Sequence, residues 1–92
     1  MSENDRVELL ASAKLALRLS SDDFDSEIQA LIDSAILDME TSGIDTAVNP
    51  VLIKQAVITY VKANFGFENP DAERLMSSYH LQIQKLAISQ PA

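Results

Sequence analysis

The sequence predicts an all-α fold, a compact bundle of four helices with short loops. Apolar residues recur at spacings of three and four residues, which is the period of an α-helix rather than of a strand. The chain of 92 residues has only two glycines and three prolines, so few positions force a helix to end. Two of the prolines follow an asparagine, at Asn49-Pro50 and Asn69-Pro70, and this pair is typical of a helix start.

Two helices are predicted in the N-terminal half, at about residues 5–19 and 22–41. Asp5 and Glu8 have capping-box spacing at the start of the first. Its apolar stripe consists of Leu9, Leu10, Ala13, Ala16 and Leu17. The apolar face of the second consists of Phe24, Ile28, Leu31, Ile32, Ala35 and Met39, widened by Ile36 and Leu37. Gly43 predicts where the second helix stops, because glycine readily takes the left-handed conformation that follows a helix.

Two more helices are predicted at about residues 50–65 and 70–88, with Asn49 as N-cap of the first of them. The helix at 50–65 is apolar nearly all round, which predicts a central position with neighbours on several sides. The inward face of the last helix consists of Ala72, Leu75 or Met76, Tyr79, Ile83, Leu86 and Ala87. We expect residues 1–92 to form a single helical domain.

The composition limits the classes of partner. The chain is 47% hydrophobic and 23% charged, which is ordinary for a globular protein. Its net charge of −7 comes from 14 acidic and 7 basic residues, too few basic residues for the positive face of a sequence-reading nucleic-acid binder. The acidity also argues against an anionic membrane surface. It suits a wall past which DNA must slide, because acidic side chains repel phosphate.

The sequence contains no arrangement of residues typical of an enzyme or a cofactor site. There is no cysteine, which excludes disulfides and cysteine-ligated metals. His80 is the only histidine and has no nucleophile motif beside it. No apolar run approaches the roughly 20 residues of a membrane span, and the N-terminal MSENDRVE is not typical of a secretory signal. We therefore expect a non-enzyme with no cofactor, no metal and no membrane contact.

An acidic cluster at Asp22, Asp23, Asp25 and Glu27 admits three interpretations. A calcium loop counted from Asp23 fails, because its sixth position is Ile28 and its twelfth is Ser34, where glycine and glutamate are needed. Catalytic carboxylates need a cleft that separates their pKa values. The favoured interpretation is a helix start, with Ser20 or Ser21 as N-cap and the acids facing the positive end of the helix dipole.

Some features predict protein contacts rather than DNA reading. A helix-turn-helix is disfavoured because the connection SGIDTAVN is longer than the usual turn, and the following helix offers only Lys54 and Lys62. In contrast, Leu81 and Ile88 lie off the inward stripe of the last helix, and Phe67 lies in a loop. With Ile36 or Leu37 also spare, the chain has more apolar surface than four helices need, and exposed apolar patches mark protein interfaces.

The order of these segments resembles the head–tail connector proteins of tailed bacteriophages, also called head-completion or adaptor proteins. The resemblance rests on LRLSSDDFDSEIQALIDSAILDMETSGI followed by NPVLIKQAVITYVKANFGFENPDAERLMSSYHLQIQKL. It covers roughly residues 14 to 86. No single piece is diagnostic, and the specificity lies in the order and spacing of the pieces.

The resemblance implies a non-enzymatic subunit that forms a ring, usually of about twelve or thirteen copies, below the portal protein. Such a ring extends the DNA channel, contacts DNA without reading its sequence, and gives a tail or stopper protein its docking surface. The expected location is the head–tail interface of the virion, after synthesis in the bacterial cytoplasm.

We expect acidic side chains to face the channel of this ring, with Asp22, Asp23, Asp25 and Glu27 as candidates. From sequence alone, Asp38 with Glu40, or Asp71 with Glu73, fit equally well. Phe67, Leu81 and Ile88 are the candidates for subunit or portal contacts. The alternative function is a small acidic helical protein-interaction module of a cellular regulatory complex, with a groove for a partner helix.

Overall fold

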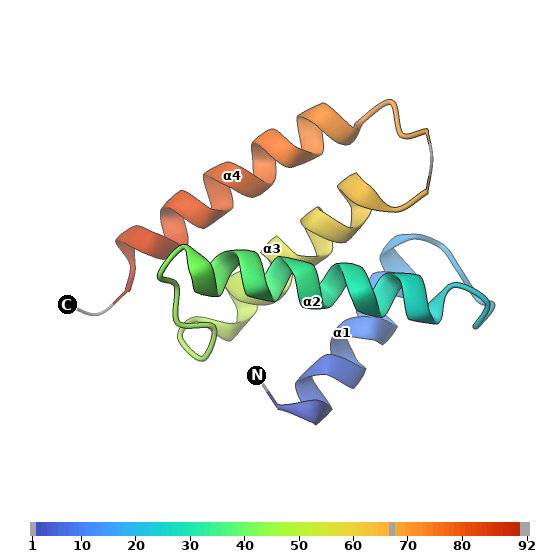
Figure 1. Ribbon diagram of the computed structural model, residues 1–92, viewed down its shortest axis with the longest axis horizontal. Helices are drawn as coiled ribbons and strands as arrows, with labels where there is room; N and C mark the ends of the chain where they lie inside the picture. The colour runs from blue at the N-terminus through green and yellow to red at the C-terminus, as the bar shows by residue number, and fades with distance from the viewer. Residues whose placement is uncertain (1, 67, 91–92) are drawn as a thin grey trace.

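The computed structural model describes residues 2–66 and 68–90, and over this part of the chain it confirms the all-α fold (Figure 1). The chain forms four helices with no strand among the described residues. They are α1 (Glu3–Ala16), α2 (Asp25–Thr41), α3 (Pro50–Asn64) and α4 (Ala72–Ile88). Their Cα atoms fit a flat shape with extents of 42 × 30 × 18 Å.

The third helix is central, as its composition predicts. α3 packs against α1, α2 and α4, and α1 and α2 also pack against each other. In the view of Figure 1, α2 crosses in front of α3, with α1 below and α4 above. The core along α3 consists of Ile53, Ala56, Val57 and Val61, all fully buried. α4 therefore depends mainly on one neighbour, whereas α2 has two.

Helix α1 begins and ends earlier than predicted. Its N-cap is Ser2, and the capping box pairs Ser2 with Asp5, not Asp5 with Glu8. Its end has no glycine. Arg18 takes the left-handed conformation instead, with a φ of 61°, and the amide of Leu19 donates to the carbonyl of Lys14 at 2.9 Å. This is a Schellman closure built on a non-glycine residue, so the sequence carries no obvious stop signal.

Helix α2 starts three residues later than predicted, and neither Ser20 nor Ser21 caps it. The N-cap is Phe24, which makes no side-chain capping bond. The Ser21 hydroxyl instead accepts from the amide of Asp23 at 3.0 Å, inside the loop. At the other end the prediction is confirmed: Gly43 has a φ of 85°, and the amide of Ile44 donates to the carbonyl of Met39 at 3.0 Å.

The two asparagine–proline pairs behave differently from each other. Pro50 is at the start of α3, as predicted, but Asn49 is left-handed and makes no side-chain cap. Asn69 and Pro70 precede α4, which starts at Ala72 because a turn intervenes. The Asn69 side chain accepts from the amide of Asp71 at 3.0 Å and donates to the carbonyl of Lys62 at 2.6 Å. Asn69 thus closes α3 as well as leading into α4.

Candidate protein–protein interface

The acidic cluster lies at one end of the molecule, but only part of it is free. Lys14 of α1 contacts Asp22 at 2.5 Å and Asp25 at 3.0 Å. The hydrogen bond from Lys14 holds the pKa of Asp22 below the usual range, and the two carboxylates raise the pKa of Lys14. Asp23 and Glu27 make no ion pair within the described residues. Two of the four predicted acids are therefore partly neutralised within the subunit.

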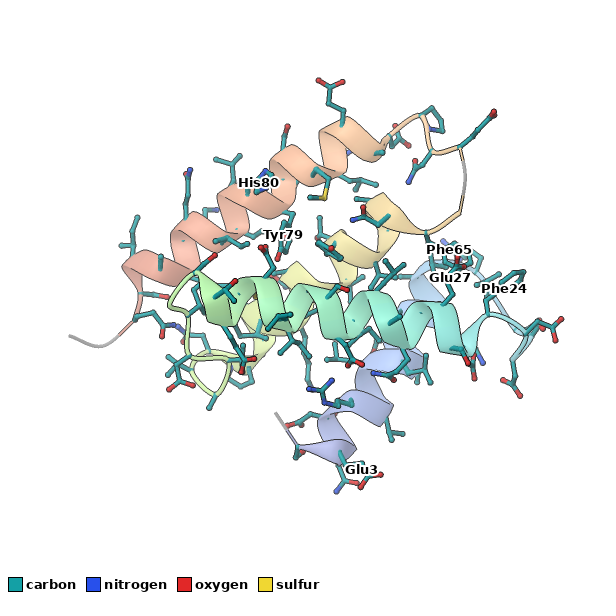
Figure 2. The ribbon with its side chains drawn as sticks, viewed as in Figure 1. Glu3, Phe24, Glu27, Phe65, Tyr79 and His80 are labelled. Carbon is teal, nitrogen blue, oxygen red and sulfur yellow. The ribbon has the colours of Figure 1, made fainter. Side chains whose placement is uncertain are left out.

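The same end of the molecule carries two aromatic rings. Phe24, predicted on the inward face of α2, is instead 44% exposed. Its ring packs edge-on against Phe65 with 5.6 Å between centroids. Figure 2 shows Phe24, Phe65 and Glu27 gathered where the α1–α2 loop lies. Phe67, one of the three predicted contact residues, lies outside the described residues.

The alternative channel acids lie elsewhere and in different settings. Asp38 accepts a hydrogen bond from the hydroxyl of the fully buried Tyr79 at 2.7 Å, so it has a structural role between α2 and α4. Burial, supported by this bond, raises the pKa of the Tyr79 hydroxyl far above its usual value. Asp71 lies 3.7 Å from Arg74. Glu40 and Glu73 are exposed and have no ion pair within residues 2–66 and 68–90.

Leu81 and Ile88 lie on the outer surface of α4, with exposed fractions of 60% and 85%. Because they are seven residues apart, they lie on the same side of the helix. Of the two α2 residues predicted to be spare, Ile36 is buried and Leu37 is 61% exposed. Sequence analysis missed Val7, Leu15 and Val51, which are more than half exposed. Val7 and Leu15 lie off the apolar stripe of α1, just as Leu81 and Ile88 lie off that of α4, so the same criterion would have found them. It does not apply to Val51, because α3 is apolar nearly all round and has no single stripe.

One surface hollow stands out because of its charge. It has a volume of about 460 Å³ and runs along α3, with Ser12 of α1 on one side and Gln82 of α4 on the other. A smaller hollow of about 130 Å³ shares Gln55 and Gln82 with it. We call the two together the α3 groove. Its apolar and basic lining residues are Val51, Leu52, Ile58, Lys54, Lys62 and Lys85.

The α3 groove is basic in an acidic protein. Three of the chain's seven lysines and arginines line it, and no acidic side chain lines it within the described residues. Lys54 pairs with Glu8 at 3.0 Å, whereas Lys62 and Lys85 have no carboxylate within ion-pair distance there. The side-chain oxygen of Gln82 is buried and accepts no hydrogen bond in the described structure. The groove therefore combines apolar surface, unpaired cations and an unused acceptor.

Another hollow, of about 450 Å³, lies between α2 and α4 over the middle of α3. Leu37, Tyr60, Met76 and His80 contribute to its walls. His80 is exposed, and its ring lies 5.8 Å from that of Tyr79 (Figure 2). Ser34, Asp38 and Thr41 of α2 complete the lining of this hollow.

No group of three or more His, Cys, Asp or Glu side chains is placed to hold a metal ion within residues 2–66 and 68–90. In that same part of the chain, no helix has the length and apolarity needed to cross a membrane.

Comparison with known proteins gives one match. Residues 9–92 match the family model described as "Phage connector protein", which covers α2, α3, α4 and most of α1. The comparisons with curated proteins and with solved structures find no match.

Proposed function

Because the chain belongs to the phage connector protein family, we propose that it is a structural subunit that forms a ring below the portal. In this proposal the ring extends the DNA channel and gives a tail or stopper protein a docking surface at the head–tail interface of the virion. The match over residues 9–92 carries the proposal. A phage connector role follows from the family, and the ring, the portal contact and the tail contact are the proposed steps.

The distribution of apolar surface supports a ring rather than a symmetric dimer. Leu81 and Ile88 are exposed on α4, Leu37 on α2 and Val51 on α3. These side chains lie on three different helices, so the chain has several non-equivalent surfaces. A ring needs two different surfaces that fit each other, whereas a two-fold dimer uses one surface twice. Leu81 and Ile88 form the proposed contact for the portal or the tail protein.

Native mass spectrometry of the purified protein, with and without portal particles, tests this proposal. A closed species of about a dozen copies, alone or on the portal, is the expected result. A monomer at every concentration that also fails to bind portal particles contradicts it. A tight symmetric dimer favours the alternative, a small acidic protein-interaction module.

We further propose that free acidic side chains line the channel, with Asp23 and Glu27 as the principal candidates of the cluster formed by Asp22, Asp23, Asp25 and Glu27. Asp22 and Asp25 contribute less, because Lys14 offsets their charge. Phosphate repulsion keeps DNA from adhering to the wall. Phage carrying Asp23→Asn with Glu27→Gln should therefore eject DNA more slowly, with the largest difference at low ionic strength.

The matched control is Asp71→Asn with Glu73→Gln, which removes the same charge at the start of α4. Unchanged ejection in the first variant and slowed ejection in the second would move the channel surface to α4. Unchanged ejection in both, and in Glu40→Gln, would contradict an acidic channel wall. Release of labelled DNA from purified particles measures the rate.

A further inference from the structure

Helix α2 has the charge opposite to that of the α3 groove. It carries five acidic residues and no basic one, namely Asp25, Glu27, Asp33, Asp38 and Glu40. Leu37 is exposed on this helix, where it also borders the hollow between α2 and α4. Asp33 and Glu40 lie four residues before and three residues after Leu37, so both are its neighbours on the helix surface. Asp33 pairs with Arg6 of α1, whereas Glu40 makes no ion pair within the described residues. The outer surface of α2 is thus one exposed leucine between acids, which we call the α2 ridge.

The ridge and the groove lie on opposite sides of the molecule. Val51, Ile58 and Lys62 of the groove recur at spacings of seven and four residues, so they share one face of α3. Val57 and Tyr60 lie on the other face, where Val57 is buried in the core and Tyr60 borders the hollow between α2 and α4. In Figure 1, α2 crosses in front of α3, and the buried side chains of α2 share one core with Val57. One subunit therefore cannot place its own ridge in its own groove.

We propose that the α2 ridge of one copy docks in the α3 groove of the next copy. Leu37 would pack on Val51 and Ile58. The unpaired Glu40 beside Leu37 would meet a lysine of the groove, whereas Asp33, which already pairs within its own subunit, contributes less. The match is that of an amphipathic helix in an apolar groove with charges at its edges. This inference rests on the proposed ring, because a front-to-back contact is heterologous and repeats from copy to copy.

The charges favour a second copy over a nucleic acid as occupant of the groove. A nucleic acid would meet three groove lysines on a chain with a net charge of −7, and its phosphates would also face Glu8 beside Lys54. The α2 ridge instead offers carboxylates and an exposed leucine on one helix. The carboxylates suit the lysines of the groove, and the leucine suits its apolar floor. The ridge is also short enough to lie within the groove: Asp33 and Glu40 are about 10 Å apart along α2, and Val51 and Lys62 about 16 Å along α3.

Complementary charge reversal tests the contact. The groove variant is Lys62→Glu with Lys85→Glu, and the ridge variant is Glu40→Lys. Each alone sets like charges against each other and should weaken self-association by at least about tenfold. Mixing the two variants pairs each altered surface with an opposite charge and should restore assembly. Sedimentation velocity over a concentration series, at low and high salt, measures the effect.

Arg74→Glu is the matched control, because Arg74 is an exposed cation of α4 that does not line the groove. It should leave assembly unchanged. Circular dichroism checks that each variant keeps its helices. A mixture that assembles no better than its components, or a control as weak as the groove variant, overturns the proposal.

Crosslinking gives an answer even if free subunits associate weakly. The chain has no cysteine, so Leu37→Cys with Val51→Cys introduces the only two thiols. With a short bis-maleimide at about 1 mM protein, a front-to-back contact yields a ladder of dimers, trimers and longer chains. Neither single-cysteine variant should form species beyond a dimer, and Leu37→Cys with Leu15→Cys should give no ladder.

The outcomes separate this inference from the proposed function. Rings by native mass without a ladder overturn the ridge-in-groove contact and leave the ring intact. A ladder whose subunits never close into a ring, alone or on portal particles, supports the contact and contradicts the ring. No ladder at the highest concentration overturns the contact.

Discussion

Helices α2 and α4 have the same length, 17 residues each, but are anchored very differently. α2 buries five side chains, Ile28, Ile32, Ala35, Ile36 and Met39. α4 buries two, Tyr79 and Leu86. α2 packs against both α1 and α3, whereas α4 packs mainly against α3. Because burial of apolar surface is the main stabilising term, α2 is anchored more firmly in the subunit than α4.

A few polar contacts supplement the packing of α4. The Tyr79 hydroxyl donates to Asp38 of α2. Near its C-terminal end, Asn49 donates to the Ser89 hydroxyl at 3.1 Å, and the amide of Asp45 donates to the Gln90 side chain at 2.8 Å. Helix α4 is therefore held by packing against the central helix α3 and by a few specific hydrogen bonds. Its outer surface remains available for contacts with another protein.

The largest expected effect is a cavity in α2. Ile32 is fully buried in the middle of α2, and α2 packs against both α1 and α3. Ile32→Ala should lower the free energy of unfolding by about 3 kcal/mol. Leu86→Ala, near the end of α4, should cost about 2 kcal/mol, because a helix end with one main neighbour can collapse further into the space. Urea denaturation measures both, and a larger loss at Leu86 would break the comparison.

An intermediate effect is expected from the bond between the two helices. Tyr79→Phe removes the hydroxyl but keeps the ring, and should cost about 1 to 2 kcal/mol. Tyr60→Phe is the control, since the two rings are neighbours with 5.1 Å between centroids and Tyr60 is less buried. A cost at Tyr60 equal to that at Tyr79 would mean that the Asp38 bond does not hold α4 to α2.

The same bond has a pH signature. Burial raises the pKa of Tyr79 in the folded state, while the unfolded side chain titrates near about 10. Above that pH the unfolded chain loses a proton that the folded chain retains, so the free energy of unfolding should fall as pH rises. Tyr79→Phe should remove this part of the alkaline loss. Urea midpoints measured from pH 8 to alkaline pH test this against the wild type.

The smallest effect on stability is expected on the outer surface of α4. Leu81→Ser and Ile88→Ser should change the free energy of unfolding by no more than about 0.5 kcal/mol, because neither side chain is in the core. Binding to portal particles should nevertheless weaken, with Leu15→Ser on α1 as the control of similar exposure. Unchanged binding in both α4 variants would exclude the outer surface of α4 as a contact surface.

The parts of the fold set by periodicity could be predicted, and the parts set by individual side chains could not. The central place of α3 follows from its apolar residues on all sides. The late start of α2 does not, because Ser21 bonds to Asp23 within the loop and Phe24 packs on Phe65, which is 41 residues away in sequence. The end of α1 depends on Arg18 adopting a conformation usual for glycine, which no local pattern indicates.

The candidate interface shows the same division. That Leu81 and Ile88 lie off the inward stripe is visible in the sequence. The α3 groove is not, because its lysines come from α3 and α4 and only the packing of these helices brings them together. Similarly, Lys14 is eight residues before Asp22, and the turn between them decides which acids remain free.

The packing of each helix mainly on its neighbours in sequence has a consequence for how the subunit is made. Apart from α1 with α3, the main helix pairs join elements that follow one another along the chain. Chains with such local contacts fold rapidly, within microseconds to milliseconds. A newly synthesised subunit would then reach its final shape long before it meets another copy. The pace of the proposed self-association would be governed by collisions between finished subunits, and therefore by their concentration.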